Sequence, residues 1–232
     1  PVARALDIGL VEPERGVFFA NLETAVNVYL DTRLPPGFDG VVVTFGQGVV
    51  GLLITRVLSN EGIARVVTID PLPIRRELSK QMGAERALDF SNHVPEAIME
   101  MTGGRGAEVV IEVSGNPEAL NTAIECAAFQ GRIVVGSWYG TKPAELDLGG
   151  SFHRKRLRIV SSQVSSVDPE LAPKWDADRR REYVRELMLD LDLEQLISHR
   201  IPFDDAAMAY ELIDGRANET IQVVLTYERP GV

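Results

Sequence analysis

Cysteine is nearly absent from this chain of 232 residues, in which Cys126 is the only one. One thiol excludes an internal disulfide framework, is too little for a structural zinc site, and fits a reducing, cytoplasmic compartment. No run of about 18 uncharged apolar residues occurs, so we expect no membrane span, and no signal peptide is visible at the start. A basic surplus is also missing, because 34 acidic and 24 basic side chains give a formal charge of −10. Such a field repels phosphate backbones and argues against nucleic acid as a partner.

One short basic run departs from this acidic average. His153, Arg154, Lys155 and Arg156 are consecutive, and Arg158 follows. The run is typical of a solvated turn that leads into a strand, but a small cationic cluster can also contact an anion or a substrate.

Short apolar runs are plentiful and alternate with helical patterns from residue 40 onward. Strands are predicted at 41–45, 66–69, 109–111, 133–135 and 157–160, and helices at 49–58, 75–82 and 117–129. Strands and helices in alternation predict an α/β fold, a doubly wound parallel sheet with helices on both faces. Helices over 176–191 and 203–213 and a strand over 220–226 follow, and they need not belong to the same sheet.

A glycine motif lies between the first predicted strand and its helix. Residues 46–51 read G-x-G-x-x-G, a pattern that gains meaning from this strand-turn-helix context. The first glycine permits a tight turn, the second lets a pyrophosphate approach the backbone, and the third lets the helix pack closely on the sheet. We therefore predict that a dinucleotide binds at Gly46, Gln47, Gly48, Val49, Val50 and Gly51.

An acidic residue stands where a ribose would lie. Asp70 ends the second predicted strand, 19 residues after Gly51. A carboxylate there accepts hydrogen bonds from both ribose hydroxyls, which favours NAD over NADP. Arg75 and Arg76 follow; they fit either a solvated helix face or, for Arg75, a contact with the adenosine side. The rival interpretations are an S-adenosylmethionine-dependent methyltransferase and a structural glycine turn with a surface aspartate.

Several segments together resemble the medium-chain dehydrogenase/reductase superfamily, the zinc-type alcohol dehydrogenases and their relatives. These segments are 45–51, 102–115, 131–136 and 201–213. The resemblance covers nearly the whole chain and implies a Rossmann domain, flanked by pieces of an incomplete GroES-like β-barrel whose amino-terminal part is absent. It implies a catalytic-domain remnant at 1–25, the Rossmann domain at 26–165, a helical connection at 166–194 and a return to the catalytic domain at 195–232.

The same resemblance implies further cofactor contacts. Thr24 would pack against the nicotinamide ring. Ser114, Gly115 and Asn116 would line the adenosine side. Val135, Gly136 and Ser137 would lie at the nicotinamide carboxamide, to which Val135 and Ser137 present backbone groups.

A zinc ligand is also implied within residues 18–25, but the sequence departs from the pattern there. If Thr24 is the nicotinamide contact, the ligand position holds Ala20, which cannot bind a metal. Glu23 is three positions further along a predicted helix and so is turned by about 300°. His93, His153 and His199 show no ligand spacing. We therefore predict no metal site in this chain, which puts the zinc-dependent mechanism in doubt.

The implied function is that of an NAD-dependent oxidoreductase of the medium-chain alcohol dehydrogenase type. Hydride would pass between an alcohol or carbonyl substrate, a small molecule, and the nicotinamide, with this chain supplying the cofactor domain. Catalytic residues are unassigned, and we expect the isolated chain to be inactive. The alternative is a non-catalytic dinucleotide-binding module or sensor. We expect a homo-oligomer, a dimer or tetramer, because a missing barrel exposes apolar surface.

Overall fold

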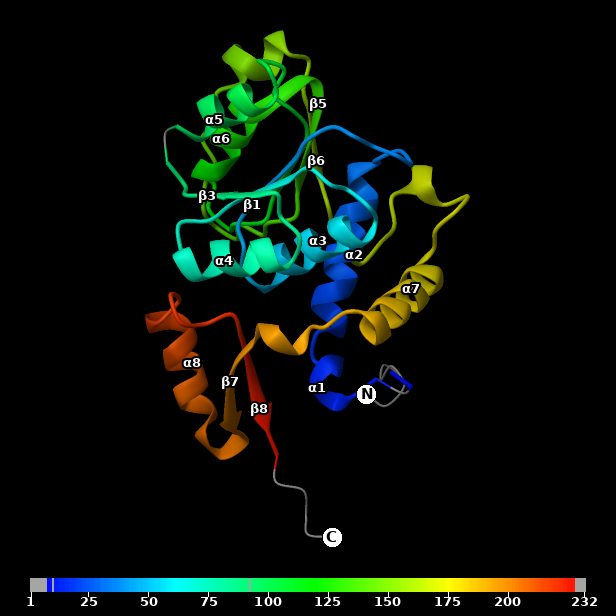
Figure 1. The fold of residues 1–232 in the computed structure, drawn as a ribbon, viewed down its shortest axis with the longest axis vertical. Coiled ribbons are helices and arrows are strands. Elements are labelled where there is room, and N and C mark those ends of the chain that lie inside the picture. The colour runs from blue at the N-terminus through cyan, green and yellow to red at the C-terminus, as the bar shows by residue number, and fades with distance from the viewer. Residues whose placement is uncertain (1–7, 10, 92, 228–232) are drawn as a thin grey trace.

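A six-stranded, wholly parallel sheet forms the centre of the molecule (Figure 1), in a computed structural model that describes residues 8–9, 11–91 and 93–227. The strand order is β3-β2-β1-β4-β5-β6, so the chain reverses direction across the sheet between β1 and β4. This order is that of a Rossmann fold, and it confirms the predicted class. The strands are β1 (Val42–Phe45), β2 (Val66–Ile69), β3 (Arg86–Leu88), β4 (Ala107–Glu112), β5 (Ala127–Val135) and β6 (Arg158–Ser161).

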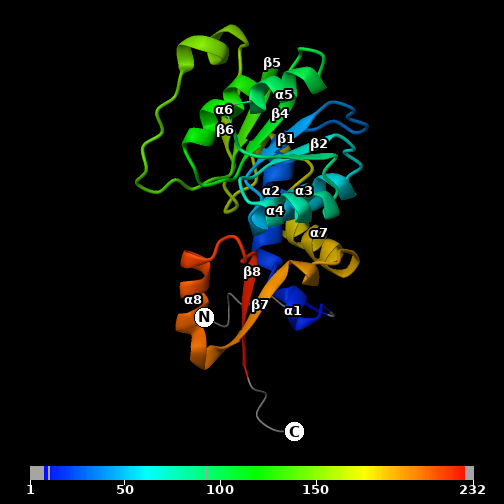
Figure 2. The same ribbon diagram turned by 60° about the vertical axis from the view of Figure 1, so that its left-hand side comes forward.

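Helices cover both faces of this sheet (Figure 2). On one face, α2 (Phe19–Thr32), α3 (Val49–Asn60) and α4 (Pro73–Gln81) pack on the strands, and α7 (Ala177–Asp190) packs against α2. The other face is covered by α5 (Val94–Met101) and α6 (Glu118–Cys126). Strands buried between two layers need apolar side chains on both faces, which is why β1 and β2 read as continuous runs of buried residues.

The border between α6 and β5 corrects one prediction. The sequence suggests a helix to residue 129, but α6 ends at Cys126 and the chain is already extended at Ala127. Ala127 pairs with Ala107 on β4, and this pairing draws residues 127–132 into the strand. Phe129 is left 63% exposed, so it does not complete an apolar helix face.

Two elements between β2 and β4 have no counterpart in the sequence predictions. β3 has only three residues, none of them fully buried, and it lies at an edge of the sheet. α5 has eight residues and begins with a proline in its first turn. Both elements are too short for their apolar residues to show a clear periodicity in the sequence.

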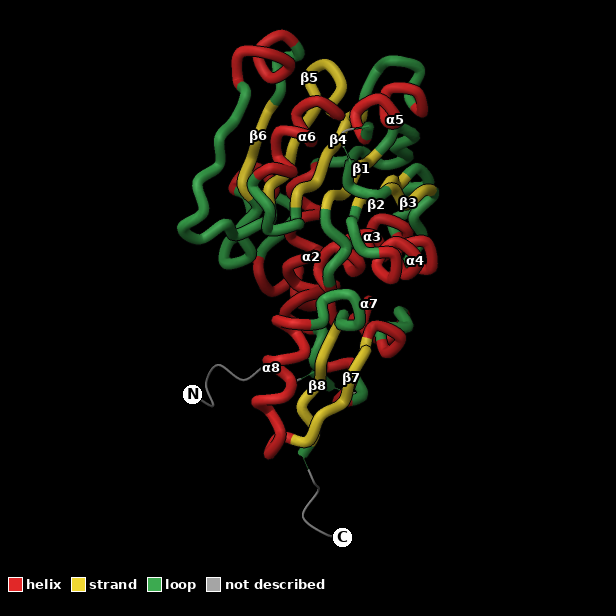
Figure 3. Tube along the Cα trace, turned by 90° about the vertical axis from the view of Figure 1, so that its left-hand side faces the viewer, coloured by secondary structure: helices red, strands yellow, loops and turns green. Residues whose placement is uncertain are grey.

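The last part of the chain forms a separate unit (Figure 3). β7 (Ile197–Pro202) and β8 (Gln222–Thr226) pair in parallel, and α8 (Ala206–Gly215) connects them. These strands lie outside the six-stranded sheet, as the sequence allowed. The short helix α1 (Pro13–Gly16) is tied to this unit through Glu14, which pairs with Arg200 on β7.

None of the described helices is long and apolar enough to cross a lipid bilayer.

Candidate functional site

The turn between β1 and α3 is shaped by its glycines. Gly46 has a φ of +89°, and a Cβ there would lie 2.5 Å from Cα of Ser114. A Cβ at Gly51 would lie 1.9 Å from the carbonyl oxygen of Gly46, so only glycine lets α3 approach the turn. Gly48 differs, because a Cβ there would meet no atom within 4 Å. Gly48 is also the N-cap of α3, and no side chain caps this helix, so the N–H groups of its first turn are available to an anion.

Asp70 holds this turn from the end of β2. Its carboxylate accepts hydrogen bonds from the backbone N–H of Gln47 at 2.7 Å and from that of Leu72 at 2.8 Å. A carboxylate has about four acceptor positions, so two stay open for ribose hydroxyls. The side chain of Gln47 is buried, where it donates to the carbonyl of Gly46 and accepts from the hydroxyl of Thr55. Gln47 therefore contributes its backbone to the site, while the hydrogen bonds of its side chain stabilise the turn.

A cavity of about 140 Å³ opens beside Asp70 at the carboxyl ends of the strands. It combines apolar walls, including the edge-to-face pair Phe45 and Phe90, with a few polar groups. Five of the predicted contacts meet there, whereas Arg76 does not line the cavity. The lining residues are Phe45, Gly46, Ile69, Asp70, Pro71, Arg75, Phe90, Ser114, Asn116 and Ala119.

The two arginines after β2 have different roles. Arg76 donates through Nη1 to the carbonyls of Asp70 and Pro71, at 2.9 and 2.8 Å, and pairs with Asp89. Arg75 lies 3.8 Å from the Asp70 carboxylate, and its buried Nε has no hydrogen-bond partner among the described residues. Arg75 is therefore the guanidinium that faces the cavity.

A buried carboxylate joins the loops after β4 and β5. Glu112, the last residue of β4, is fully buried and accepts from both the N–H and the hydroxyl of Ser114. Its other oxygen accepts from the hydroxyl of Tyr139. Burial, with the hydrogen bond and charge of Glu112, raises the pKa of Tyr139 above its usual range, so the phenol remains a donor. Gly115 closes the network by donating its N–H to the hydroxyl of Ser137 at 2.8 Å.

The sequence predictions missed Glu112 and Tyr139. The signal for Glu112 was present, because a carboxylate ends the buried apolar strand β4, much as Asp70 directly follows β2. Tyr139 had no such signal, since it lies 27 residues away in an irregular loop.

The segment after β5 is already hydrogen-bonded within the chain. The N–H groups of Gly136 and Ser137 both donate to the carbonyl of Glu112, at 2.9 and 3.2 Å. The carbonyl of Val135 accepts from Ser162 at 2.8 Å. A ligand at this place would therefore use the remaining lone pairs of the carbonyls rather than the N–H of Ser137.

Thr24 lies on α2, near the end of β5. Val28 on the same helix approaches Gly136 so closely that a Cβ on the glycine would lie 3.0 Å from it. Thr24 is one turn before Val28 and so shares its face of the helix. Its hydroxyl donates to the carbonyl of Ala20 at 3.0 Å.

The described residues do not form a zinc site. Glu23, three positions after Ala20, forms ion pairs with Arg180 at 2.9 Å and with Arg181 at 3.4 Å. Within the described ranges, no three His, Cys, Asp or Glu side chains lie close enough to hold a metal ion.

A dinucleotide, by contrast, fits the geometry. The uncapped helix start and the open space at Gly48 suit a pyrophosphate. The cavity beside Asp70 and Arg75 suits an adenosine.

Comparison with known proteins gives one family and many relatives. Residues 49–177 match the family described as zinc-binding dehydrogenases. The chain is 27% identical over 190 residues to D-guloside 3-dehydrogenase of Escherichia coli K12, which covers 80% of this chain and 54% of that protein. It is 30% identical over 213 residues to L-threonine 3-dehydrogenase of Pyrococcus horikoshii, covering 89% and 57%. The chain thus spans about half the length of the curated relatives it matches.

Solved structures share the fold. A protein described as a short chain alcohol dehydrogenase from Escherichia coli CFT073, complexed with NADH, superimposes with a TM-score of 0.81 at 23% identity, covering 97% of this chain and 63% of that one. A zinc-binding dehydrogenase from Sinorhizobium meliloti 1021, bound to NADP, gives a TM-score of 0.75 at 22% identity, covering 97% and 64%.

Proposed function

This chain belongs to the zinc-binding dehydrogenase family, and from that premise we propose that it is the cofactor-binding part of an oxidoreductase. The reaction of the whole protein is hydride transfer between an alcohol or carbonyl carbon of a small molecule and NAD(H). The observation that carries the proposal is the meeting of the Gly46–Gly51 turn, Asp70 and Arg75 at the carboxyl ends of the strands. The guloside and threonine relatives also act on small molecules, as their names state.

We propose that different segments of the chain bind different parts of the dinucleotide. When bound, the dinucleotide supplies the hydride acceptor or donor. The turn at 46–51 and the start of α3 bind its pyrophosphate. Ser114, Gly115 and Asn116 border the adenosine. Val135, Gly136, Ser137 and Thr24 border the nicotinamide from β5 and α2.

We place the domain borders at residues 25, 165 and 194. Helix α2 crosses the first of them as one continuous helix, so the two parts on either side of residue 25 are rigidly joined there. A homo-oligomer, dimer or tetramer, is part of the proposal, because β6 lies at one edge of the sheet and has no further strand beside it among the described residues. Light scattering that gives a single-chain mass at micromolar concentration would contradict it.

NAD is the proposed cofactor, and Asp70 is the reason. Its free acceptor positions suit ribose hydroxyls, whereas the extra phosphate of NADP would bring a second negative charge beside a carboxylate. Arg75, 3.8 Å away, offsets part of that repulsion. One hydrogen bond to a charged group contributes roughly 1.5–3 kcal/mol, so we expect NADH to bind at least about tenfold more tightly than NADPH.

Fluorescence titration of NADH and NADPH on the native chain tests this. Asp70→Asn removes the charge and keeps an acceptor, so the preference for NADH should shrink. Arg76→Gln is the matched control, because Arg76 is engaged with backbone carbonyls. Equal affinity of the native chain for both cofactors refutes the choice of NAD, and binding of neither refutes the proposed function.

A further inference from the structure

A second hollow lies at the opposite end of the sheet from the dinucleotide cavity. Its volume is about 350 Å³, and its lining residues are Gln130, Phe152, His153, Arg156, Leu157 and Arg158. Arg158 is the first residue of β6, which places the hollow at the amino ends of the strands. The dinucleotide cavity lies beyond the carboxyl ends, so the two share no residue.

The basic side chains of this hollow have no partners among the residues that the structure describes. His153, Arg156 and Arg158 form no ion pair and no side-chain hydrogen bond with any residue in the described part of the chain. No carboxylate lines the hollow, although the chain carries a formal charge of −10. Lys155, in the same basic run, is different: its Nζ turns inward and donates to the carbonyls of Glu125 and Ala127, each at 2.9 Å.

The backbone at Arg156 does not explain why an arginine stands there. The N–H of Arg156 donates to the carbonyl of His153, and the N–H of Leu157 donates to that of Phe152. This is the Schellman pattern that ends a helical turn, with Arg156 at the left-handed position, φ +54°. Glycine occupies that position without strain and is the usual residue. Arginine therefore stands there against the backbone preference.

Gln130 opposes Arg156 with the same unusual conformation. Its φ is +58°, and its N–H donates to the carbonyl of Lys155 at 2.7 Å. Only three non-glycine residues in the described ranges are left-handed, and two of them line this hollow. Such conformations concentrate at ligand sites.

We propose that this hollow binds a small organic diphosphate or triphosphate. Guanidinium groups match phosphate oxygens with paired donors, and the imidazole and the Gln130 amide add further donors. The volume lies in the range of small-molecule pockets, and Phe152 gives an apolar wall to the organic part. Long polyanions are disfavoured by the negative charge of the rest of the chain.

Arg156→Gly is a sharp test, because it removes the guanidinium while supplying the residue that the Schellman motif prefers. Calorimetric titration uses inorganic pyrophosphate as the probe, on the full chain with saturating NADH so that the glycine-rich turn is filled. We expect pyrophosphate to bind to the native chain. Its affinity should fall by at least about tenfold in Arg156→Gly and in Arg158→Gln, because each substitution removes one charge-assisted contact. The melting temperature of Arg156→Gly should equal or exceed that of the native chain.

Arg105→Gln is the control, since it removes one exposed positive charge elsewhere and should leave pyrophosphate binding unchanged. Three results would overturn the site: no pyrophosphate binding by the native chain, equal binding by Arg156→Gly, or an equal loss in Arg105→Gln. Equal affinity for a single inorganic phosphate would show an unspecific counterion site and would also overturn the proposal.

Discussion

The two loop systems at the carboxyl ends of the strands are built by opposite means. The turn between β1 and α3 depends on missing side chains, because a Cβ at Gly51 would collide with the carbonyl of Gly46. The loops after β4 and β5 depend on side chains that are present, since Glu112 holds Ser114 and Tyr139, and Ser137 holds Gly115. Backbone shape sets the first region, and a buried polar network sets the second.

Because they are built differently, the two regions should tolerate amino-acid substitutions differently. A backbone turn fails when any atom is added at its closest approach. A network of side chains fails in steps, as each donor loses its acceptor. The stability losses caused by substitutions should therefore differ in size between the two regions. They should also differ in whether the losses of two substitutions add.

Gly51→Ala should have the largest effect. The added methyl forces α3 away from the turn, and we expect a stability loss of about 3 kcal/mol and loss of NADH binding. Gly48→Ala is the matched control, because its methyl enters open space. It should keep the native melting temperature and weaken only NADH binding. Thermal unfolding and NADH fluorescence measure both, and a native melting temperature for Gly51→Ala would contradict the close approach.

Glu112→Ala should have the second largest effect. It leaves the hydroxyl of Tyr139 and the N–H of Ser114 without their acceptor, at a cost of about 2 kcal/mol. NADH affinity should also fall, because Ser114 lines the cavity beside Asp70 in which we propose that the adenosine binds.

Glu108→Ala is the comparison for Glu112, on the same strand. Glu108 accepts from the N–H of Val41 at 2.9 Å, at the other end of β4. The substitution Glu108→Ala should lower the free energy of unfolding without lowering NADH affinity. If the two variants lose the same amount of NADH affinity in titrations, Glu112 has no particular role in holding the cofactor loops.

Ser137→Ala should have the smallest effect, about 1 kcal/mol, because one N–H, that of Gly115, loses its acceptor. The informative quantity is its combination with Glu112→Ala. Loops already released by the first substitution have less to lose, so the double variant should cost less than the sum of the single ones. Urea unfolding of the four proteins measures this, and strict additivity would mean that the two contacts act independently.

Sequence patterns located the first region well and the second poorly. Gly46–Gly51 and Asp70 carry local signals, since a glycine motif between a strand and a helix and an acid at the next strand end can be read in order. Arg75 and Arg76 are adjacent in the sequence, yet only the fold shows that one faces the cavity and the other binds carbonyls. The resemblance to medium-chain dehydrogenases supplied Ser114–Asn116 and Val135–Ser137, which no local pattern marks.

The end of α6 shows the same limit in the fold. Residues 117–129 have a helical pattern, but the pairing of Ala127 with Ala107 ends the helix early. That pairing joins residues 20 positions apart, so no local propensity contains it.

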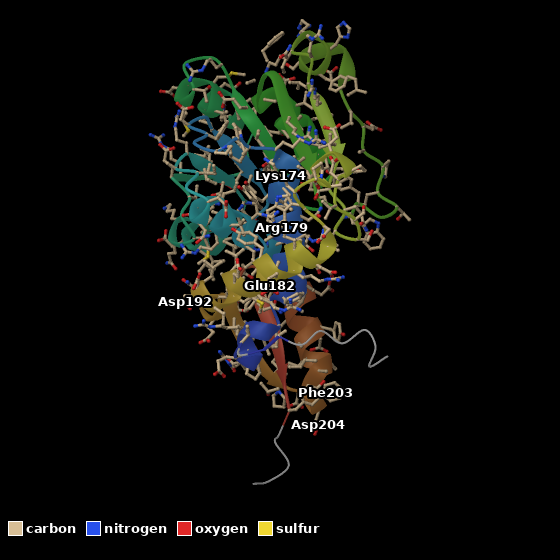
Figure 4. All side chains as sticks on the ribbon, turned by 90° about the vertical axis from the view of Figure 1, so that its right-hand side faces the viewer. Lys174, Arg179, Glu182, Asp192, Phe203 and Asp204 are labelled. Atoms are coloured by element: carbon tan, nitrogen blue, oxygen red, sulfur yellow. The ribbon has the colours of Figure 1, made fainter. Side chains whose placement is uncertain are left out.

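Figure 4 shows another case on the outer side of the molecule, where Arg179 and Glu182 lie along α7 and Phe203 and Asp204 lie at the far end of the β7-α8-β8 unit. The sequence of α7 has a charged pattern. It does not predict that Arg180, in the middle of that pattern, is only 2% exposed and binds Glu23 and Asn27 on α2. Phe203 is apolar but half exposed, and it stacks on Tyr227 with ring centroids 4.9 Å apart.

By itself, the sequence determined the α/β class, the parallel sheet and the place of the glycine-rich turn between β1 and α3, because these follow from periodicity and from the conformational freedom of glycine. Tertiary structure alone decided which carboxylate is buried among the loops, which arginine faces the cavity, and which basic side chains converge on the second hollow. Those outcomes depend on contacts between residues far apart in the chain, and burial and hydrogen-bond partners exist only once the strands are in register.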